Sequence, residues 1–180
     1  MDQLVAPWRI EWVERDDEPD GCPFCVLPER SDAREANVVA AADRAFVLLN
    51  NYPYNPGHAM VIPHRHTGEY TALSEEELLG HAVLKQRTLR AIEAAFDPNG
   101  VNMGYNLGAG AGGSIEHLHA HAVPRWEGDT NFMAVIGDTQ VIVEALEDSY
   151  DRLHEAFSAQ GNVQPREDDT DAEQAVRIDP

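Results

Sequence analysis

His117-Leu118-His119-Ala120-His121-Ala122-Val123 is the stretch of sequence from which the fold can be worked out. Histidine alternates here with small or apolar residues, which is the pattern of a β-strand with one buried face. A strand places residues i, i+2 and i+4 on the same face, about 6.5–7 Å apart. The pattern therefore predicts three imidazoles in a row, with Leu118, Ala120 and Ala122 on the opposite face.

A glycine-rich segment lies directly before these histidines, with four glycines between Gly108 and Gly113. Such a run can be a flexible connection, or its backbone amides can hold an oxyanion because no Cβ blocks the approach. Imidazole can attack phosphorus, leave again and transfer protons near neutral pH. The position of the loop beside the histidines favours phosphate binding, with Arg125 or a protonated histidine as a candidate source of positive charge.

The remaining periodic segments predict further strands and two helices. Residues 45–50 and 58–62 are expected to form two strands of a hairpin, joined by a turn rich in Asn and Pro. Residues 101–106 predict a half-buried strand. Ser74 followed by Glu77 is a capping-box signature. The apolar stripes expected are Leu78, Ala82, Leu89, Ile92 and Phe96 for the first helix, and Ile142, Leu146, Leu153 and Phe157 for a final helix capped by Asp138.

Together these elements predict an α+β fold, an antiparallel β-sheet with a long helix after the first hairpin and a C-terminal helix. A chain of 180 residues suits a single domain. We divide it into an N-terminal segment with an acidic loop (1–20), the folded domain (21–158) and an acidic tail expected to be disordered (159–180).

The chain is strongly acidic. It has 32 Asp and Glu against 13 Lys and Arg, a formal net charge of −19, and Lys85 is its one lysine. This charge argues against nucleic acid and anionic membranes as partners, and no run approaches the roughly 18 apolar residues of a membrane span. Without a signal-peptide pattern we expect a cytoplasmic protein, and its acidity favours a halophilic origin, where salt screens self-repulsion.

The histidine stretch resembles the His-φ-His-φ-His-φ-φ signature (φ, an apolar residue) of the histidine triad (HIT) superfamily. Residues 46–63, with Pro56-Gly57-His58 and Val61-Ile62-Pro63, are similar to the first hairpin of that superfamily. Residues 106–114 and 124–133 resemble its diadenosine-polyphosphate phosphorylase- or hydrolase-like prokaryotic branch. The resemblance covers roughly residues 6–158 and implies a HIT-like fold.

This resemblance implies a nucleotidyl transfer in two steps. His119 would attack the α-phosphorus of a nucleoside phosphate, and water, phosphate or another acceptor would discharge the nucleotidyl-histidine. His121 would assist departure of the leaving group, with His117 as the first triad residue and His58 as a supporting fourth histidine. Gly113 stands where better-known branches carry Gln. The substrate residues implied are Asn50 for the ribose and Asn106, Gly113 and Ser114 for the phosphate oxygens.

Cys22 and Cys25 are the two cysteines of the chain and form a Cys-x-x-Cys pair. Two thiolates supply half of a tetrahedral zinc site, and two buried thiols are the alternative. In zinc-bearing members of the superfamily the other two ligands fall at the positions of His66 and His117. The resemblance therefore implies a structural Zn²⁺ held by Cys22, Cys25, His66 and His117.

The main functional hypothesis is a nucleotidyl hydrolase or transferase that cleaves at the α-phosphate of dinucleoside polyphosphates or related adenine nucleotides. Three alternatives stay open: a phosphorylase that uses phosphate as acceptor, a nucleotide-binding regulatory module with little turnover, and a zinc-dependent interaction protein. Members of the superfamily commonly pair, so the resemblance also implies a homodimer. His64, His81 and His154 match no motif, and we expect no catalytic role for them.

Overall fold

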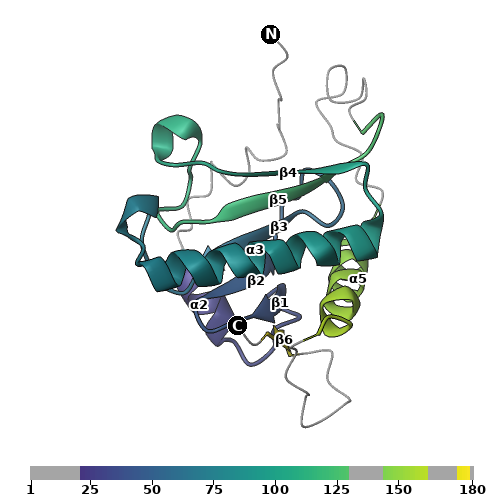
Figure 1. Ribbon diagram of the computed structural model, residues 1–180, viewed down its shortest axis with the longest axis horizontal. Helices are drawn as coiled ribbons and strands as arrows, with labels where there is room; N and C mark the ends of the chain where they lie inside the picture. The colour runs from purple at the N-terminus through teal and green to yellow at the C-terminus, as the bar shows by residue number, and fades with distance from the viewer. Residues whose placement is uncertain (1–20, 130–143, 162–173, 179–180) are drawn as a thin grey trace.

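In the computed structural model, residues 21–129, 144–161 and 174–178 are described. Within these ranges six strands form one sheet in the order β4-β5-β3-β2-β1-β6, in which β1 and β6 alone run parallel (Figure 1). The strands are β1 (Val38–Ala41), β2 (Ala45–Leu49), β3 (Ala59–Pro63), β4 (Gly100–Tyr105), β5 (Ala120–Arg125) and β6 (Val176–Arg177). The helices are α2 (Pro23–Val26), η2 (Leu27–Glu29), η3 (Tyr70–Ala72), α3 (Glu75–Phe96), η4 (Ala109–Ala111) and α5 (Leu146–Ser158). The predicted α+β class is confirmed.

The predicted hairpin is confirmed by β2 and β3, which pair antiparallel with Phe46 opposite Ile62. Every residue of both strands is buried, because the sheet is covered on both faces. Alternation along the strands divides the apolar side chains between two cores. The larger core packs against α3 and α5, and the smaller core packs around Phe24 of α2 on the opposite face.

Figure 1 shows α3 lying across the sheet, with α5 beside it near one end. Both helices contribute to the larger core, which contains Leu84 and Ile92 of α3 and Leu153 and Phe157 of α5. In β5, His121 lies opposite Met60 of β3, and Met60 belongs to the smaller core. His121 is therefore on the α2 face of the sheet, away from the two long helices.

The start of α3 is as predicted. The Ser74 hydroxyl accepts from the Glu77 backbone N–H (3.2 Å), and the Glu77 carboxylate accepts from the Ser74 N–H (2.7 Å). The buried face of the helix is rotated from the predicted stripe, because Ala82 is exposed and Leu78 and Leu89 are only partly buried. Its fully buried residues are His81, Leu84, Thr88, Ala91, Ile92 and Phe96.

Two polar residues account for this rotation. The His81 ring donates through Nε2 to the Val61 carbonyl (3.0 Å), and the Thr88 hydroxyl donates to the Leu84 carbonyl (2.8 Å). With these donors satisfied, both side chains can be buried beneath the sheet. A prediction of the buried face from apolar residues alone does not include His81 and Thr88.

The histidine stretch departs from the predicted continuous strand. Strand β5 begins at Ala120, so His121 lies in the strand, whereas His117 and His119 lie in the segment before it. The reason is local: the backbone N–H of Leu118 pairs with the Thr67 carbonyl in a loop (2.6 Å). Leu118, Ala120 and Ala122, expected on the face opposite the histidines, are all buried.

The other predicted elements are found with altered limits. Strand β4, predicted to be half-buried, lies at the end of the sheet; Val101 and Tyr105 are partly buried, whereas Met103 is 37% exposed. Helix α5 begins at Leu146 with Ala145 at its N-cap, whereas Asp138 and Ile142 lie outside the described residues. No helix among the described residues is long and apolar enough to cross a membrane.

The chain near its C-terminus differs from the expected disordered tail. Val176 and Arg177 form β6, which runs parallel to β1 with Val176 opposite Ala40. Val176 and Ile178 are each only 2% exposed. The expectation of disorder over 159–180 is therefore wrong for residues 174–178, because two apolar side chains complete the core beside α5. The acidic segment 1–20 lies outside the described residues.

Candidate active site and metal centre

A cavity of about 260 Å³ lies on the α2 face of the sheet and contains two of the triad histidines. Most of its wall residues come from three separate parts of the chain, α2 with η2, the end of β2 with the turn after it, and residues 106–115, and Met60 of β3 adds to them. Six of the lining residues matter most for its chemistry: Arg30, Asn50, Asn106, Ser114, His119 and His121. Three of the four predicted substrate residues thus meet the predicted nucleophile, whereas Gly113 does not line this cavity.

The hydrogen bond behind His119 identifies its nucleophilic atom. His119 Nδ1 lies 2.8 Å from the backbone carbonyl of His117. A carbonyl can only accept, so Nδ1 carries the proton and the lone pair is on Nε2. The ring is 8% exposed and meets the Phe24 ring edge-on, with centroids 5.2 Å apart. His119 is therefore held in the tautomer that attack by Nε2 on phosphorus requires.

A chain of hydrogen bonds fixes the proton of His121 in the same way. The Tyr54 backbone N–H donates to His58 Nδ1 (3.1 Å), so the proton of neutral His58 is on Nε2. His58 Nε2 lies 3.0 Å from His121 Nδ1, which must accept it. The proton of His121 is thus on Nε2. His119 and His121, with ring centroids 4.9 Å apart, thus have a nitrogen lone pair and an N–H donor side by side.

The turn that carries His58 is tied to the far end of β5. Asn55 donates through Nδ2 to the Pro124 carbonyl (2.8 Å) and to the Asp129 carboxylate (2.9 Å), and its own carbonyl accepts from the His58 N–H (3.1 Å). The side chain of Asn55 is buried. No sequence pattern singled out this residue, because its role depends on a contact across 69 positions of sequence.

His117 is separated from the other two triad histidines by its orientation. Its Nε2 donates to the Pro63 carbonyl (2.8 Å), so Nδ1 presents a lone pair. That nitrogen lies 3.3 Å from Cys22 Sγ and 3.7 Å from Cys25 Sγ. Burial lowers the pKa of His117, which favours the neutral ring that a metal ligand needs.

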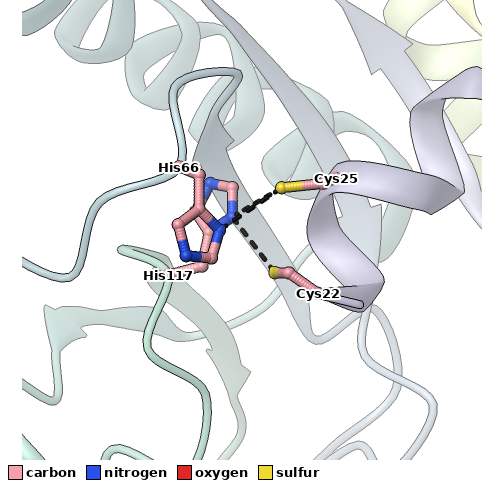
Figure 2. A group of neighbouring side chains, drawn as sticks. All are labelled: Cys22, Cys25, His66 and His117. Atoms are coloured by element: carbon pink, nitrogen blue, oxygen red, sulfur yellow. Dashed lines mark hydrogen bonds between the residues drawn. The ribbon is translucent and has the colours of Figure 1, made fainter. Parts of the chain in front are cut away.

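The four predicted metal ligands come together, as Figure 2 shows. The ligand atoms of Cys22, Cys25, His66 and His117 all lie within 4.8 Å of one another, and His66 Nδ1 is 3.3 Å from Cys25 Sγ. Tetrahedral zinc separates such atoms by about 3.3–3.8 Å. Burial, with Cys22 nearby, raises the pKa of the Cys25 thiol, so metal binding must release a proton. The donor set and spacing fit Zn²⁺.

The glycine loop differs from the expected phosphate cradle. The backbone N–H groups of Ala111, Gly112 and Gly113 donate to the carbonyls of Gly108 and Ala109 within the loop, at 3.0–3.2 Å. These three amides are therefore engaged within the loop itself. A Cβ on Gly113 would lie 3.0 Å from the carbonyl oxygens of Asn106 and Gly108, so this backbone has little room for the Gln of other branches.

Arg125 does not supply the positive charge expected at the site. Its guanidinium binds the Asp129 carboxylate, with Nε to Oδ2 at 2.5 Å, and this contact lowers the pKa of Asp129 to about 2. Among the described residues that line the cavity, Arg30 of the segment after η2 is the one arginine. No motif surrounds Arg30, so no sequence pattern singled it out.

The predicted ribose residue, Asn50, is 6% exposed at the end of β2. Its Oδ1 accepts from the Tyr52 backbone N–H (2.9 Å), and its Nδ2 lies 3.5 Å from Met60 Sδ. Asn50 thus lines the cavity and also holds the turn that brings Tyr52 into the same wall.

Known proteins are similar to this chain in sequence and in fold. The family model described as HIT domain matches residues 32–128. A protein named AP-4-A phosphorylase from Mycobacterium tuberculosis is 40% identical over 158 residues, covering 83% of this chain and 80% of the relative. A bis(5'-adenosyl)-triphosphatase from Dictyostelium discoideum is 30% identical over 92 residues, covering 51% of this chain and 62% of the relative.

Solved structures of histidine triad proteins have a similar fold. A Zn-bound histidine triad family protein from Mycobacterium smegmatis is superimposed with a TM-score of 0.63 at 26% identity, covering 77% of this chain and 94% of that one. A hypothetical histidine triad nucleotide-binding protein from Sulfolobus tokodaii has a TM-score of 0.61 at 26% identity, covering 76% and 92%.

Proposed function

Because the chain belongs to the HIT domain family, we propose that it is an enzyme that cleaves dinucleoside polyphosphates at an α-phosphate through a covalent nucleotidyl-histidine on His119. The observation that carries the proposal is the pair of opposite tautomers at His119 and His121 inside one cavity. Adenine dinucleotides are the substrates we expect, since the relatives named above carry activities on such molecules in their names.

In the first step His119 Nε2 forms a bond to the α-phosphorus, and the bond from that phosphorus to the bridging oxygen breaks. The departing oxygen keeps the electron pair of that bond and leaves as a phosphate anion, which accepts a hydrogen bond from His121 Nε2. In the second step an oxygen of the acceptor forms a bond to phosphorus, the bond to His119 Nε2 breaks with its electron pair returning to that nitrogen, and the proton that the acceptor loses passes to solvent. Arg30, Asn106 and Ser114 line the cavity where the charged oxygens would lie.

The acceptor distinguishes two versions of this enzyme. Water would release AMP, whereas inorganic phosphate would release ADP. The 40% identity to a protein named AP-4-A phosphorylase favours phosphate. With diadenosine tetraphosphate as substrate, we expect ADP and ATP when phosphate is present. If AMP forms in equal amounts with and without phosphate, the enzyme is a hydrolase.

The covalent step has a direct test. Wild-type protein mixed with α-³²P-labelled substrate and quenched without acid is expected to carry label on His119, identified by peptide mapping. His119→Ala should carry no label and lose at least about 10³-fold in kcat. His64→Ala serves as control, because His64 is exposed and lies outside the cavity. Turnover by His119→Ala at the wild-type rate would refute the covalent mechanism.

We also propose that Cys22, Cys25, His66 and His117 hold a structural Zn²⁺. Support comes from the distances among the four ligand atoms and from the Pro63 carbonyl behind His117, a partner of the kind that orients histidine ligands. The Cys22→Ser, Cys25→Ser double variant is expected to lose the zinc that elemental analysis finds in the wild type. Equal zinc in both proteins would exclude this site.

We propose finally that the enzyme is a homodimer that pairs through the β4 edge of the sheet. Within the described residues β4 has a neighbour on one side, β5. Met103 of β4 is 37% exposed, which suits a covered surface. Sedimentation analysis should give a dimer for the wild type and a monomer for Met103→Lys. A monomeric wild type would contradict this proposal.

A further inference from the structure

A second cavity, of about 650 Å³, lies beside the first and takes no part in the proposed chemistry at phosphorus. It is formed by residues 68–71, which include the start of η3, and by residues 106–109 and 113–118. Its volume is within the range of cavities that bind small molecules, about 300–1,000 Å³. It is therefore large enough to accept a nucleoside.

The two cavities meet at one wall. Asn106, Ser114 and Ile115 line both of them, while His119 and His121 line only the first. A ligand whose α-phosphorus lies at His119 would thus send its bridging oxygen and further phosphates past Asn106 and Ser114. The second cavity is on the far side of that wall, where the leaving group would extend.

The residues of the second cavity suit the nucleoside end of a leaving group better than its phosphates. Glu69 and Glu116 line it, and no arginine or lysine is among its described lining residues. Carboxylates repel phosphate but accept hydrogen bonds from ribose hydroxyls. Tyr70 and Leu107, 37% and 50% exposed, provide apolar surface, and an aromatic ring is a platform on which any base can stack.

The Tyr70 ring has a supported position. It meets the Tyr105 ring edge-on, with centroids 5.3 Å apart. Tyr105 in turn receives a hydrogen bond from Lys85 Nζ (2.8 Å) and lies 3.2 Å from Nδ1 of buried His81. Tyr70 is thus exposed on one side and held on the other, which is the condition for a stacking surface rather than a mobile side chain.

We propose that this second cavity binds the second nucleoside of a dinucleoside polyphosphate, with its base on Tyr70 and its ribose near Glu69 and Glu116. The proposal rests on the proposed function for the identity of the reaction, but it concerns binding and is tested without turnover. Binding in the second cavity would make the chain selective for substrates with a nucleoside at both ends.

Equilibrium binding to the His119→Ala protein provides the test. Diadenosine tetraphosphate is compared with adenosine 5′-tetraphosphate, which has the same phosphate chain but one nucleoside. We expect the dinucleotide to bind at least about tenfold more tightly, within the range for loss of one base–aromatic stack. Adding Tyr70→Leu should remove most of that difference, and Tyr70→Phe should keep it. AMP affinity should be the same in all three proteins.

Tyr52→Leu, again in the His119→Ala protein, is the matched control, because Tyr52 lines the first cavity and should weaken all three ligands alike. Equal affinity for the two tetraphosphates would overturn the proposal, as would a Tyr70→Leu effect that is equal for AMP. Failure of the wild type to turn over diadenosine tetraphosphate would count against the proposed function. The difference in affinity between the two tetraphosphates would still show whether the second cavity binds a nucleoside.

Discussion

In each of the three triad histidines, one ring nitrogen forms a hydrogen bond to a neighbouring group. That hydrogen bond determines whether the other ring nitrogen carries a proton or a lone pair. The backbone carbonyl of His117 leaves His119 Nε2 as a nucleophile. The Pro63 carbonyl leaves His117 Nδ1 toward the cysteines. His58 leaves the proton of His121 on Nε2. Three identical side chains thus acquire three different roles from their neighbours.

At His58 the proposed mechanism predicts a loss that depends on the leaving group. His58→Phe keeps a ring to stack on Tyr54, 5.1 Å away, but removes the Nε2 donor to His121. We expect kcat for the phenyl ester of AMP, whose leaving group is a strong base and needs the hydrogen bond from His121, to fall roughly 100-fold, and kcat for diadenosine tetraphosphate, whose leaving group is a weakly basic phosphate, to fall much less. Steady-state kinetics on both substrates measures this. Equal losses would show that His58 does not act through the leaving group.

Asp129 should contribute stability that depends on pH. Its pKa, held at about 2 chiefly by Arg125, is below its value in the unfolded chain, about 3.9. A lowered pKa gives stability that is complete above about pH 4 and is lost as the pH falls toward 2. Urea unfolding should find Asp129→Asn about 1–2 kcal/mol less stable at pH 7, and the difference should disappear as the pH falls below 2. A constant difference would contradict the assignment.

Among the elements, α2 connects the metal ligands to the active site. Its four residues lie between Cys22 at the N-cap and Leu27. Phe24, within this short helix, is 4% exposed and meets the rings of both His117 and His119 edge-on, at 5.7 and 5.2 Å. One wall of the first cavity is therefore attached to the sheet at the predicted zinc site.

Removal of the metal should therefore weaken nucleotide binding. Without Zn²⁺, Cys22 and Cys25 lose their attachment to His66 and His117, so the wall that carries Phe24 is less well held. We expect the dissociation constant of AMP, measured by calorimetry, to rise about tenfold in chelator-treated protein and to recover when zinc is added back. An unchanged dissociation constant in metal-free protein would show that the metal site does not support the nucleotide site.

Strand β6 is short, but its two buried side chains should contribute strongly to stability. Val176→Ala with Ile178→Ala removes apolar groups that are 2% exposed, and we expect a loss of about 4 kcal/mol in urea unfolding. Arg177→Ala on the same strand is the control, because its ion pair with Asp43 is exposed and should contribute less than about 1 kcal/mol. A double variant as stable as the control would refute a role for β6.

At the scale of the whole molecule, the net charge of −19 has the same sign as the charge of the proposed polyphosphate substrate. A polyphosphate is repelled by the overall field, so attraction must be local. Arg30 at the first cavity and the donors on His121 and Ser114 are the groups placed to provide it. Attraction of the substrate therefore does not explain the acidity, and we connect it instead with the conditions in which the protein folds.

We propose that those conditions are high salt, because dissolved ions screen repulsion among carboxylates within a few ångströms. Circular dichroism should show folded protein in about 2 M KCl and reversible loss of structure as the salt is removed. Full stability in the absence of salt would contradict halophilic adaptation.

The sequence predicted the hairpin of β2 and β3, the capping box at Ser74 and the meeting of Cys22, Cys25, His66 and His117, because each depends on a local pattern or on a motif of the family. It did not predict the buried face of α3. Hydrogen bonds of His81 and Thr88 to backbone carbonyls make those polar residues core residues, and such partners have no signature in local sequence.

Residue types and their spacing determined the α+β class, and the resemblance of the sequence to the histidine triad superfamily supplied the nucleophile candidate and the set of metal ligands. Only the tertiary structure decided how the histidines divide, since tautomers follow from partners distant in sequence, such as His58 for His121 and Pro63 for His117. It also placed Arg30 rather than Arg125 at the cavity and added β6 to the sheet. Long-range contacts select among local possibilities because burial requires every polar group to find a partner.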